Sequence, residues 1–126
     1  MTVAGLVIAL VVLVALTTMQ LLLIVGLPLG EYAWGGRDRV LPPRRRIAAA
    51  VAIVIYALFM VILLSRAGLL GPVSVLIVVT TWVLFGYAAF SVLPNMASTS
   101  SRERRVQVPV SIALALGVGL VAVSGG

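Results

Sequence analysis

The chain of 126 residues contains no cysteine, no histidine and no lysine. Without cysteine it can form neither a disulfide framework nor a thiolate metal site. Without histidine and lysine it lacks the commonest acid–base catalyst, the commonest metal ligand and the amine of Schiff-base chemistry. We therefore expect a protein that is not an enzyme and that carries no metal ion or other cofactor.

Charge is also scarce, and apolar residues are abundant. Charged residues make up 10% of the chain and hydrophobic residues 63%, against roughly 25% and 45–50% in soluble domains. A water-soluble fold of this length could not bury so much apolar surface, so the lipid bilayer must be its solvent. Because backbone amides in lipid must be paired within the segment, the composition predicts an all-α integral membrane protein.

Four apolar runs are long enough to suggest membrane spans, at about residues 3–27, 47–65, 73–93 and 109–123. A spanning helix needs about 20 residues, so the fourth run is short. The first run lacks a basic leader and exceeds the roughly 15 apolar residues of a signal peptide, so we expect it to be retained. The prediction is a membrane-spanning four-helix bundle that forms one domain over residues 1–126.

The arginines indicate an orientation. All of them except Arg66 lie in two segments, between the first and second runs and between the third and fourth. Positively charged segments stay in the cytoplasm. We therefore expect a multi-pass protein of a bacterial inner membrane, with both arginine-rich segments in the cytoplasm and both termini outside.

The two halves of the chain show a weak similarity. One shift along the chain places Leu27-Pro28 on Leu93-Pro94 and Arg39-Val40 on Arg105-Val106. In the expected orientation, each half also crosses the membrane from the outside to the cytoplasm and back to the outside. The pattern fits two parallel-repeat helical hairpins, and it equally fits two unrelated hairpins whose loops have similar lengths.

Small residues four positions apart mark candidate helix contacts, because they let backbones approach closely in lipid. Such pairs are Gly5 with Ala9, Ala48 with Ala52, Ala113 with Gly117, and Ala115 with Gly119.

Three intramembrane residues are candidates for a polar site: Gln20, Thr17 and Trp82. Gln20 should face the bundle, because an amide in lipid is costly; it forms either an interhelical hydrogen bond or a substrate contact. Thr17, like Thr80 or Thr81, can bond to its own helix. Trp82 is interpreted as a packing residue, with a ligand wall as the alternative.

The charged segments supply candidates for binding anionic lipid headgroups or a partner protein, in preference to nucleic acid, because the arginines flank apolar spans. The candidates are Glu31, Arg37, Arg39, Arg44, Arg45, Arg46, Glu103, Arg104 and Arg105. Charge complementarity also suggests that Glu103 pairs with the first segment, for example with Arg39, and Glu31 with the second.

Three motifs resemble those of a group of small four-span bacterial integral membrane proteins. They are the G-x-P-x-G-x-x-x-x-G-G pattern from Gly26 to Gly36, the L-P-x-x-x-R pattern from Leu41 to Arg46, and the N-x-x-S-x-S-x-x-E-R pattern from Asn95 to Arg104. The resemblance covers nearly the whole chain. It implies the four-span architecture and no particular activity, substrate or cofactor.

Two functions are compatible with these features. The first is a non-enzymatic accessory or partner-binding membrane protein whose arginines lie at anionic headgroups. The second is a small transporter or channel-like protein that works as a homo-oligomer, with Gln20, the threonines and Trp82 along its path. A proton-driven exporter is disfavoured, since the expected spans hold no ionisable side chain. A polar stripe across the whole membrane would favour the transporter, and a dry bundle the accessory protein.

Overall fold

The computed structural model describes residues 2–26, 40, 42–97 and 101–124. These residues form four helices: α1 (Thr2–Ile24), α2 (Pro43–Arg66), α3 (Val75–Met96) and α4 (Ser101–Ser124). Each helix is long and apolar enough to cross a membrane, and the helices pack against one another. The predicted all-α membrane-spanning four-helix bundle is therefore confirmed.

Two helices begin earlier than the apolar runs suggested. α2 begins at Pro43, and α4 begins at Ser101, so that Pro109 lies inside it. Hydropathy marks only the part of a helix that lies in lipid, whereas helical hydrogen bonding continues into the polar interface. With 24 residues, α4 is roughly 36 Å long at 1.5 Å per residue, and its apolar window of 18 residues covers roughly 27 Å of that length.

The connection from α2 to α3 is a short loop over residues 67–74. Gly68 and Gly71 have φ angles of 83° and 128°, a region that favours glycine. Ser74 then caps α3, because its hydroxyl accepts a hydrogen bond from the Ile77 amide at 3.3 Å. The loop holds the adjoining ends of α2 and α3 close together.

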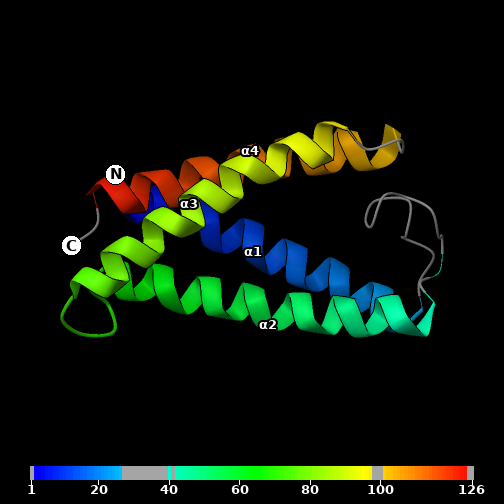
Figure 1. The fold of residues 1–126 in the computed structure, drawn as a ribbon, viewed down its shortest axis with the longest axis horizontal. Helices are drawn as coiled ribbons and strands as arrows, with labels where there is room; N and C mark the ends of the chain where they lie inside the picture. Colours follow the sequence, from blue (N-terminus) through cyan, green and yellow to red (C-terminus); the bar gives the residue numbers. More distant parts are fainter. Residues whose placement is uncertain (1, 27–39, 41, 98–100, 125–126) are drawn as a thin grey trace.

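α4 is the central helix of the bundle. It packs extensively on both α1 and α3, while α2 packs mainly on α1 and meets α3 along a much smaller interface. α2 and α3 are joined at the left of Figure 1 and diverge toward the right. A parallel repeat would make the α1–α4 and α2–α3 interfaces equivalent, so the difference between them does not support the repeat.

The closest helix contact joins α1 to α4. A Cβ atom added to Gly117 would lie 2.8 Å from the Ala9 nitrogen and 2.9 Å from the Gly5 oxygen. A Cβ atom added to Gly5 would lie 2.6 Å from the Leu120 Cβ. These distances are too short for a side chain, so the two backbones touch where the small residues of α1 and α4 predicted a contact.

Gly119, on another side of α4, allows a similar approach by α3. A Cβ atom there would lie 2.8 Å from the Phe85 ring. The predicted small face around Ala115 and Gly119 is therefore also a contact face.

The half of the bundle near Thr2 and Ser124 is tightly packed and apolar. Its buried side chains come from all four helices and include Leu6, Leu13, Leu63, Leu84, Val118 and Val121. The outward faces are also apolar, with exposed residues such as Val11, Leu58 and Val83. This surface suits lipid as the surrounding solvent.

Polar side chains close this end of the bundle. The Thr2 and Ser124 hydroxyls lie 2.9 Å apart and share a hydrogen bond between α1 and α4. The buried Arg66 donates from Nη2 to the Ala122 carbonyl at 3.0 Å. A cation at the last turn of α4 also compensates the carbonyl end of that helix.

Replacing Gly117 with valine should separate α1 from α4, because the new side chain would overlap the α1 backbone. We expect a loss of about 1–3 kcal/mol in the free energy of unfolding, measured by circular dichroism as SDS is titrated into mixed micelles. Gly86→Val is the matched control, since nothing lies within 4 Å of a Cβ at that glycine. Equal stability of the two variants would contradict the contact.

Candidate functional site

A cavity of about 610 Å³ lies between the four helices, in the half of the bundle near the starts of α2 and α4. One wall is a single face of α4, formed by Glu103, Gln107, Ser111 and Leu114. Residues four apart share a helix face, so the first three form a polar stripe. All three are buried, with 5–8% of their surfaces exposed.

The wall formed by α2 is mostly apolar, with Ala48, Val51, Ala52 and Ile55 along the cavity. The small residues Ala48 and Ala52, predicted as a helix contact, thus line the cavity, and their short side chains leave part of its space open. Ser91 and Asn95 of α3 add further polar groups to the lining. The cavity is therefore amphipathic, with an apolar wall and a polar one.

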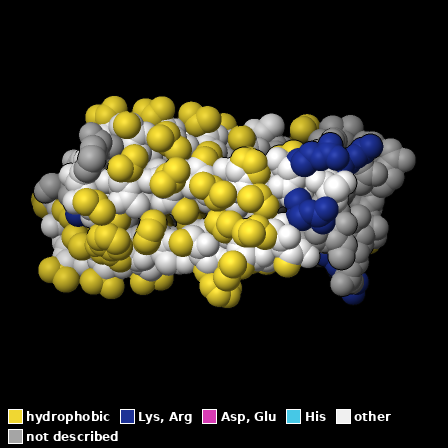
Figure 2. Space-filling model, turned by 90° about the horizontal axis from the view of Figure 1, so that it is seen from above, with side chains coloured by type: hydrophobic (Ala, Val, Ile, Leu, Met, Phe, Trp, Pro, Cys, Tyr) yellow, Lys and Arg dark blue, Asp and Glu magenta, His cyan; other side chains and the backbone are white. Residues whose placement is uncertain are grey.

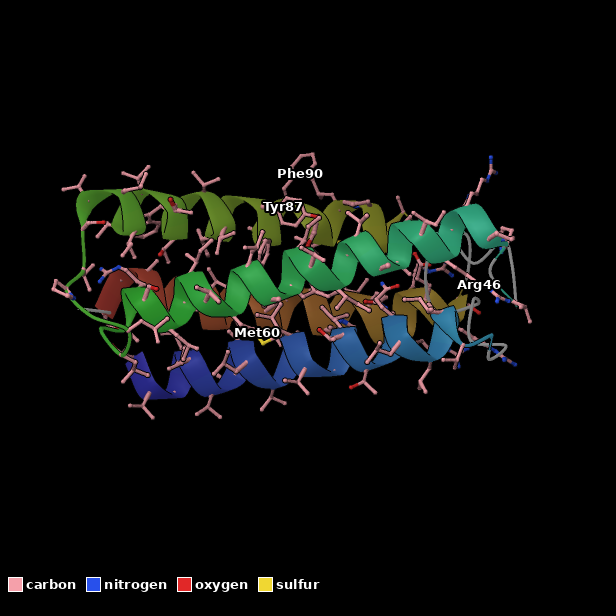
Figure 3. All side chains as sticks on the ribbon, turned by 90° about the horizontal axis from the view of Figure 1, so that it is seen from below. Arg46, Met60, Tyr87 and Phe90 are labelled. Carbon is pink, nitrogen blue, oxygen red and sulfur yellow. The ribbon has the colours of Figure 1, made fainter. Side chains whose placement is uncertain are left out.

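The deep end of the cavity is closed by an aromatic pair that bridges α2 and α3. The rings of Phe59 and Tyr87 meet edge to face with their centroids 5.8 Å apart. In Figure 3, Tyr87 lies near the middle of α3, whereas Phe90 points away from the bundle. On the side of this pair away from the arginines, the apolar core around Leu63 and Leu84 begins.

Gln20 lies in the cavity wall, as predicted for a residue that faces the bundle. It is 4% exposed and its side chain hydrogen-bonds to Tyr56. Within the described part of the chain its Oε1 atom has no hydrogen-bond partner. A buried acceptor of this kind is costly unless a ligand or water donates to it.

Other polar contacts order the cavity wall. The Gln107 amide donates from Nε2 to the Met19 sulfur at 3.5 Å, a weak bond that links α4 to α1. The Ser111 hydroxyl donates to the Val108 carbonyl at 3.0 Å in its own helix.

The threonine predictions are partly confirmed. Thr80 and Thr81 donate to the Leu76 and Ile77 carbonyls, each at 2.7 Å. The prediction for Thr17 is wrong: the Oγ1 atom of Thr17 is buried without a partner in the described residues. Its neighbour Thr18 makes the expected bond, to the Val14 carbonyl at 2.8 Å.

Trp82 does not line the cavity. It is 44% exposed on α3 and its ring meets that of Phe85 edge to face at 5.9 Å. Trp82 therefore contributes nothing to this cavity, and its alternative role as a ligand wall stays a prediction.

The described arginine candidates do not lie in loops. Arg44, Arg45 and Arg46 lie in the first turn of α2, and Arg104 and Arg105 lie near the start of α4. Figure 2 shows arginine side chains gathered at one end of an otherwise apolar face. Among the described arginines, Arg66 lies at the opposite end.

These arginines differ in exposure. Arg44, Arg104 and Arg105 are exposed, while Arg45 and Arg46 are half-buried. Arg46, labelled at the end of α2 in Figure 3, points to the end of α1: its Nη2 atom would lie 3.4 Å from a Cβ at Gly26. A cation there compensates the carbonyl end of α1.

Three candidates, Glu31, Arg37 and Arg39, lie outside the described residues. The ion pairs predicted for Glu31 and between Glu103 and Arg39 therefore stay predictions.

Glu103 lies in the first turn of α4, ahead of the expected fourth span that began at Pro109, and it is 6% exposed. Hydropathy alone does not reveal the stripe from Glu103 to Ser111. It assigns Glu103 and Gln107 to a loop and Ser111 to the fourth span, although all three lie on one helix. Their spacing of four residues is the signal in the sequence that indicates a shared face.

The polar stripe stops halfway along α4. Beyond Ser111 the buried residues of the helix are Leu114, Gly117, Val118, Val121 and Ala122. α4 therefore does not form the polar stripe across the whole membrane that would favour a transporter.

No protein family matches the chain, and neither a curated protein nor a solved structure shows significant similarity to it. The resemblance to small four-span bacterial proteins therefore stays a prediction from the loop motifs.

Single cysteines should distinguish the hollow half of the bundle from the apolar half, because the chain has no cysteine of its own. Ser111→Cys lines the cavity, and Val118→Cys is its matched control on the same helix. Methanethiosulfonates react with the thiolate form of cysteine, and burial among apolar side chains disfavours the thiolate. A water-soluble methanethiosulfonate should therefore modify Val118→Cys at least about tenfold more slowly than Ser111→Cys. Equal rates in detergent would contradict the cavity.

Proposed function

We propose that the chain is a non-enzymatic, small integral membrane protein that binds anionic lipid headgroups at its arginine-rich end. The observation that carries this proposal is the position of its arginines. Those at the starts of α2 and α4 share one end of the bundle, and α2 has no acidic residue in its first turn.

The helix dipole makes this arrangement unfavourable for the protein alone. The start of a helix carries a partial positive charge, so arginines there are repelled by the dipole, whereas anions are attracted to it. α4 has one acidic residue in its first turn, Glu103, and it is buried, whereas Arg44, Arg104 and Arg105 are exposed. The two helix starts and these arginines therefore form a positive surface. Lipid phosphates at the membrane interface are the anions within reach of that surface.

We also propose an orientation in the membrane, which is supported by the same distribution of arginines. In a bacterial inner membrane the positive-inside tendency directs the starts of α2 and α4 to the cytoplasm and the ends at Thr2 and Ser124 outside. The labelling of Ser111→Cys should then be faster in inside-out vesicles than in right-side-out ones, and the reverse order would contradict this orientation. Association with another copy or with a second membrane protein stays a prediction.

Removing the exposed arginines should weaken the preference for anionic lipids. Each arginine near a charged surface contributes about 1 kcal/mol, or roughly a fivefold preference per residue. We expect the triple variant Arg44→Gln, Arg104→Gln and Arg105→Gln to retain far less phosphatidylglycerol, relative to phosphatidylcholine, when released from mixed nanodiscs into native mass spectrometry.

Arg66→Gln is the control, since Arg66 lies at the other end and is buried against α4. Added salt should reduce the lipid preference of the native chain. If the triple variant keeps the native preference, headgroup binding by these arginines is excluded.

A further inference from the structure

The cavity has the depth of one membrane leaflet. Its α4 wall runs from Glu103 to Leu114, which corresponds to roughly 16 Å at 1.5 Å per residue. The hydrocarbon core of a bilayer is about 30 Å thick, so one leaflet contributes about half of that. The volume of about 610 Å³ also lies within the roughly 300–1,000 Å³ range of ligand pockets.

The cavity reaches the lipid-facing surface between α2 and α3. Tyr87 and Pro94 line it and are nevertheless exposed. The two helices diverge on this side of the bundle, as Figure 1 shows. An occupant can therefore enter sideways from the bilayer, between α2 and α3.

Along α4 the polarity of the lining decreases with depth, from Glu103 and Gln107 near the arginine-rich end to Leu114 at the deep end. The α2 wall is apolar from its shallow end at Ala48. An amphiphile in the membrane has the same order, with polar groups at the interface and an apolar chain beneath them. The α2 wall, which includes Ala48, Val51 and Ala52, offers an apolar surface along which a chain can lie.

One buried atom indicates what the polar part of the occupant must supply. Gln20 is 4% exposed, lines the cavity and holds an Oε1 acceptor without a partner in the described residues. A group that donates a hydrogen bond, such as a hydroxyl, satisfies this atom. Glu103 also lines this end, but the arginines at the starts of α2 and α4 outnumber it among the described residues and favour a phosphate on the same molecule.

We propose that the cavity holds one phospholipid of the leaflet at the arginine-rich end, an anionic phosphodiester whose headgroup ends in hydroxyls. One acyl chain lies along the α2 wall and the phosphate lies toward the arginines. The headgroup beyond the phosphate turns back into the cavity, so that one of its hydroxyls donates to Gln20 Oε1. This inference rests on the proposed headgroup binding, and it adds a defined site and a preference for a hydroxylated headgroup.

The headgroup preference is tested with two lipids of the same charge. Phosphatidylglycerol carries headgroup hydroxyls, and phosphatidylmethanol carries a methyl cap instead. In nanodiscs that contain equal amounts of both, the native chain should retain phosphatidylglycerol about fivefold more often, as expected for one hydrogen bond. Gln20→Leu should abolish this preference, and equal retention of the two lipids by the native chain would overturn the hydroxyl contact.

Occupancy of the cavity is tested by filling it. Ala52→Trp places an indole in the cavity, while Ala50→Trp places the same group on the outward face of α2, where Ala50 is exposed. Native mass spectrometry of the detergent-purified protein should show the retained phosphatidylglycerol lost in the first variant and kept in the second. Equal retention by the two variants would overturn the cavity site.

The outcomes separate this inference from the proposed function. If Ala52→Trp keeps its lipid but the triple arginine variant loses it, headgroup binding stands and the cavity site is wrong. If the arginine variant keeps its lipid preference, the proposed function itself fails. Should Ala52→Trp lose helicity, the comparison of Gln20→Leu with the native chain still decides the inference.

Discussion

The structure depends on the close contact between α1 and α4. Lipid tails are as apolar as leucine, so helices in a bilayer gain little from burying apolar side chains against each other. Gly5, Ala9 and Gly117 instead let the two backbones touch, with Gly117 too close to α1 for any side chain. The contact joins the first and last helices of the described chain, and it makes α4 the helix on which α3 also packs.

This packing divides the bundle into two unlike halves. Near Thr2 and Ser124 the four helices enclose an apolar core, and Arg66 lies at its end, with a hydrogen bond to α4. Toward the starts of α2 and α4, α2 lies apart from α3 and a cavity with polar residues takes the place of the core. The polar and charged groups therefore concentrate at the end where arginines and lipid phosphates can meet.

Much of the fold could be predicted from the sequence, because lipid allows few alternatives. The four apolar runs, the small residues of α1 and α4, and the inward position of Gln20 all follow from the cost of unpaired polar groups in hydrocarbon and from the need for close backbone packing. The site was less predictable. Hydropathy begins the fourth span at Pro109, which separates Glu103 from Ser111, and no local pattern shows that α2 and α3 diverge beside them.

The antiparallel pairing of α1 with α4 is the central claim, and an engineered disulfide tests it most directly. The hydroxyl oxygens of Thr2 and Ser124 lie 2.9 Å apart, a separation that sulfur atoms can close to a bond of about 2.05 Å with small side-chain adjustments. The double variant Thr2→Cys and Ser124→Cys should form an intramolecular disulfide in oxidised membranes, seen as a mobility shift of the monomer. Thr18→Cys with Ser124→Cys, at opposite ends, should not. A crosslink in the second pair, or only intermolecular crosslinks in the first, would contradict the account.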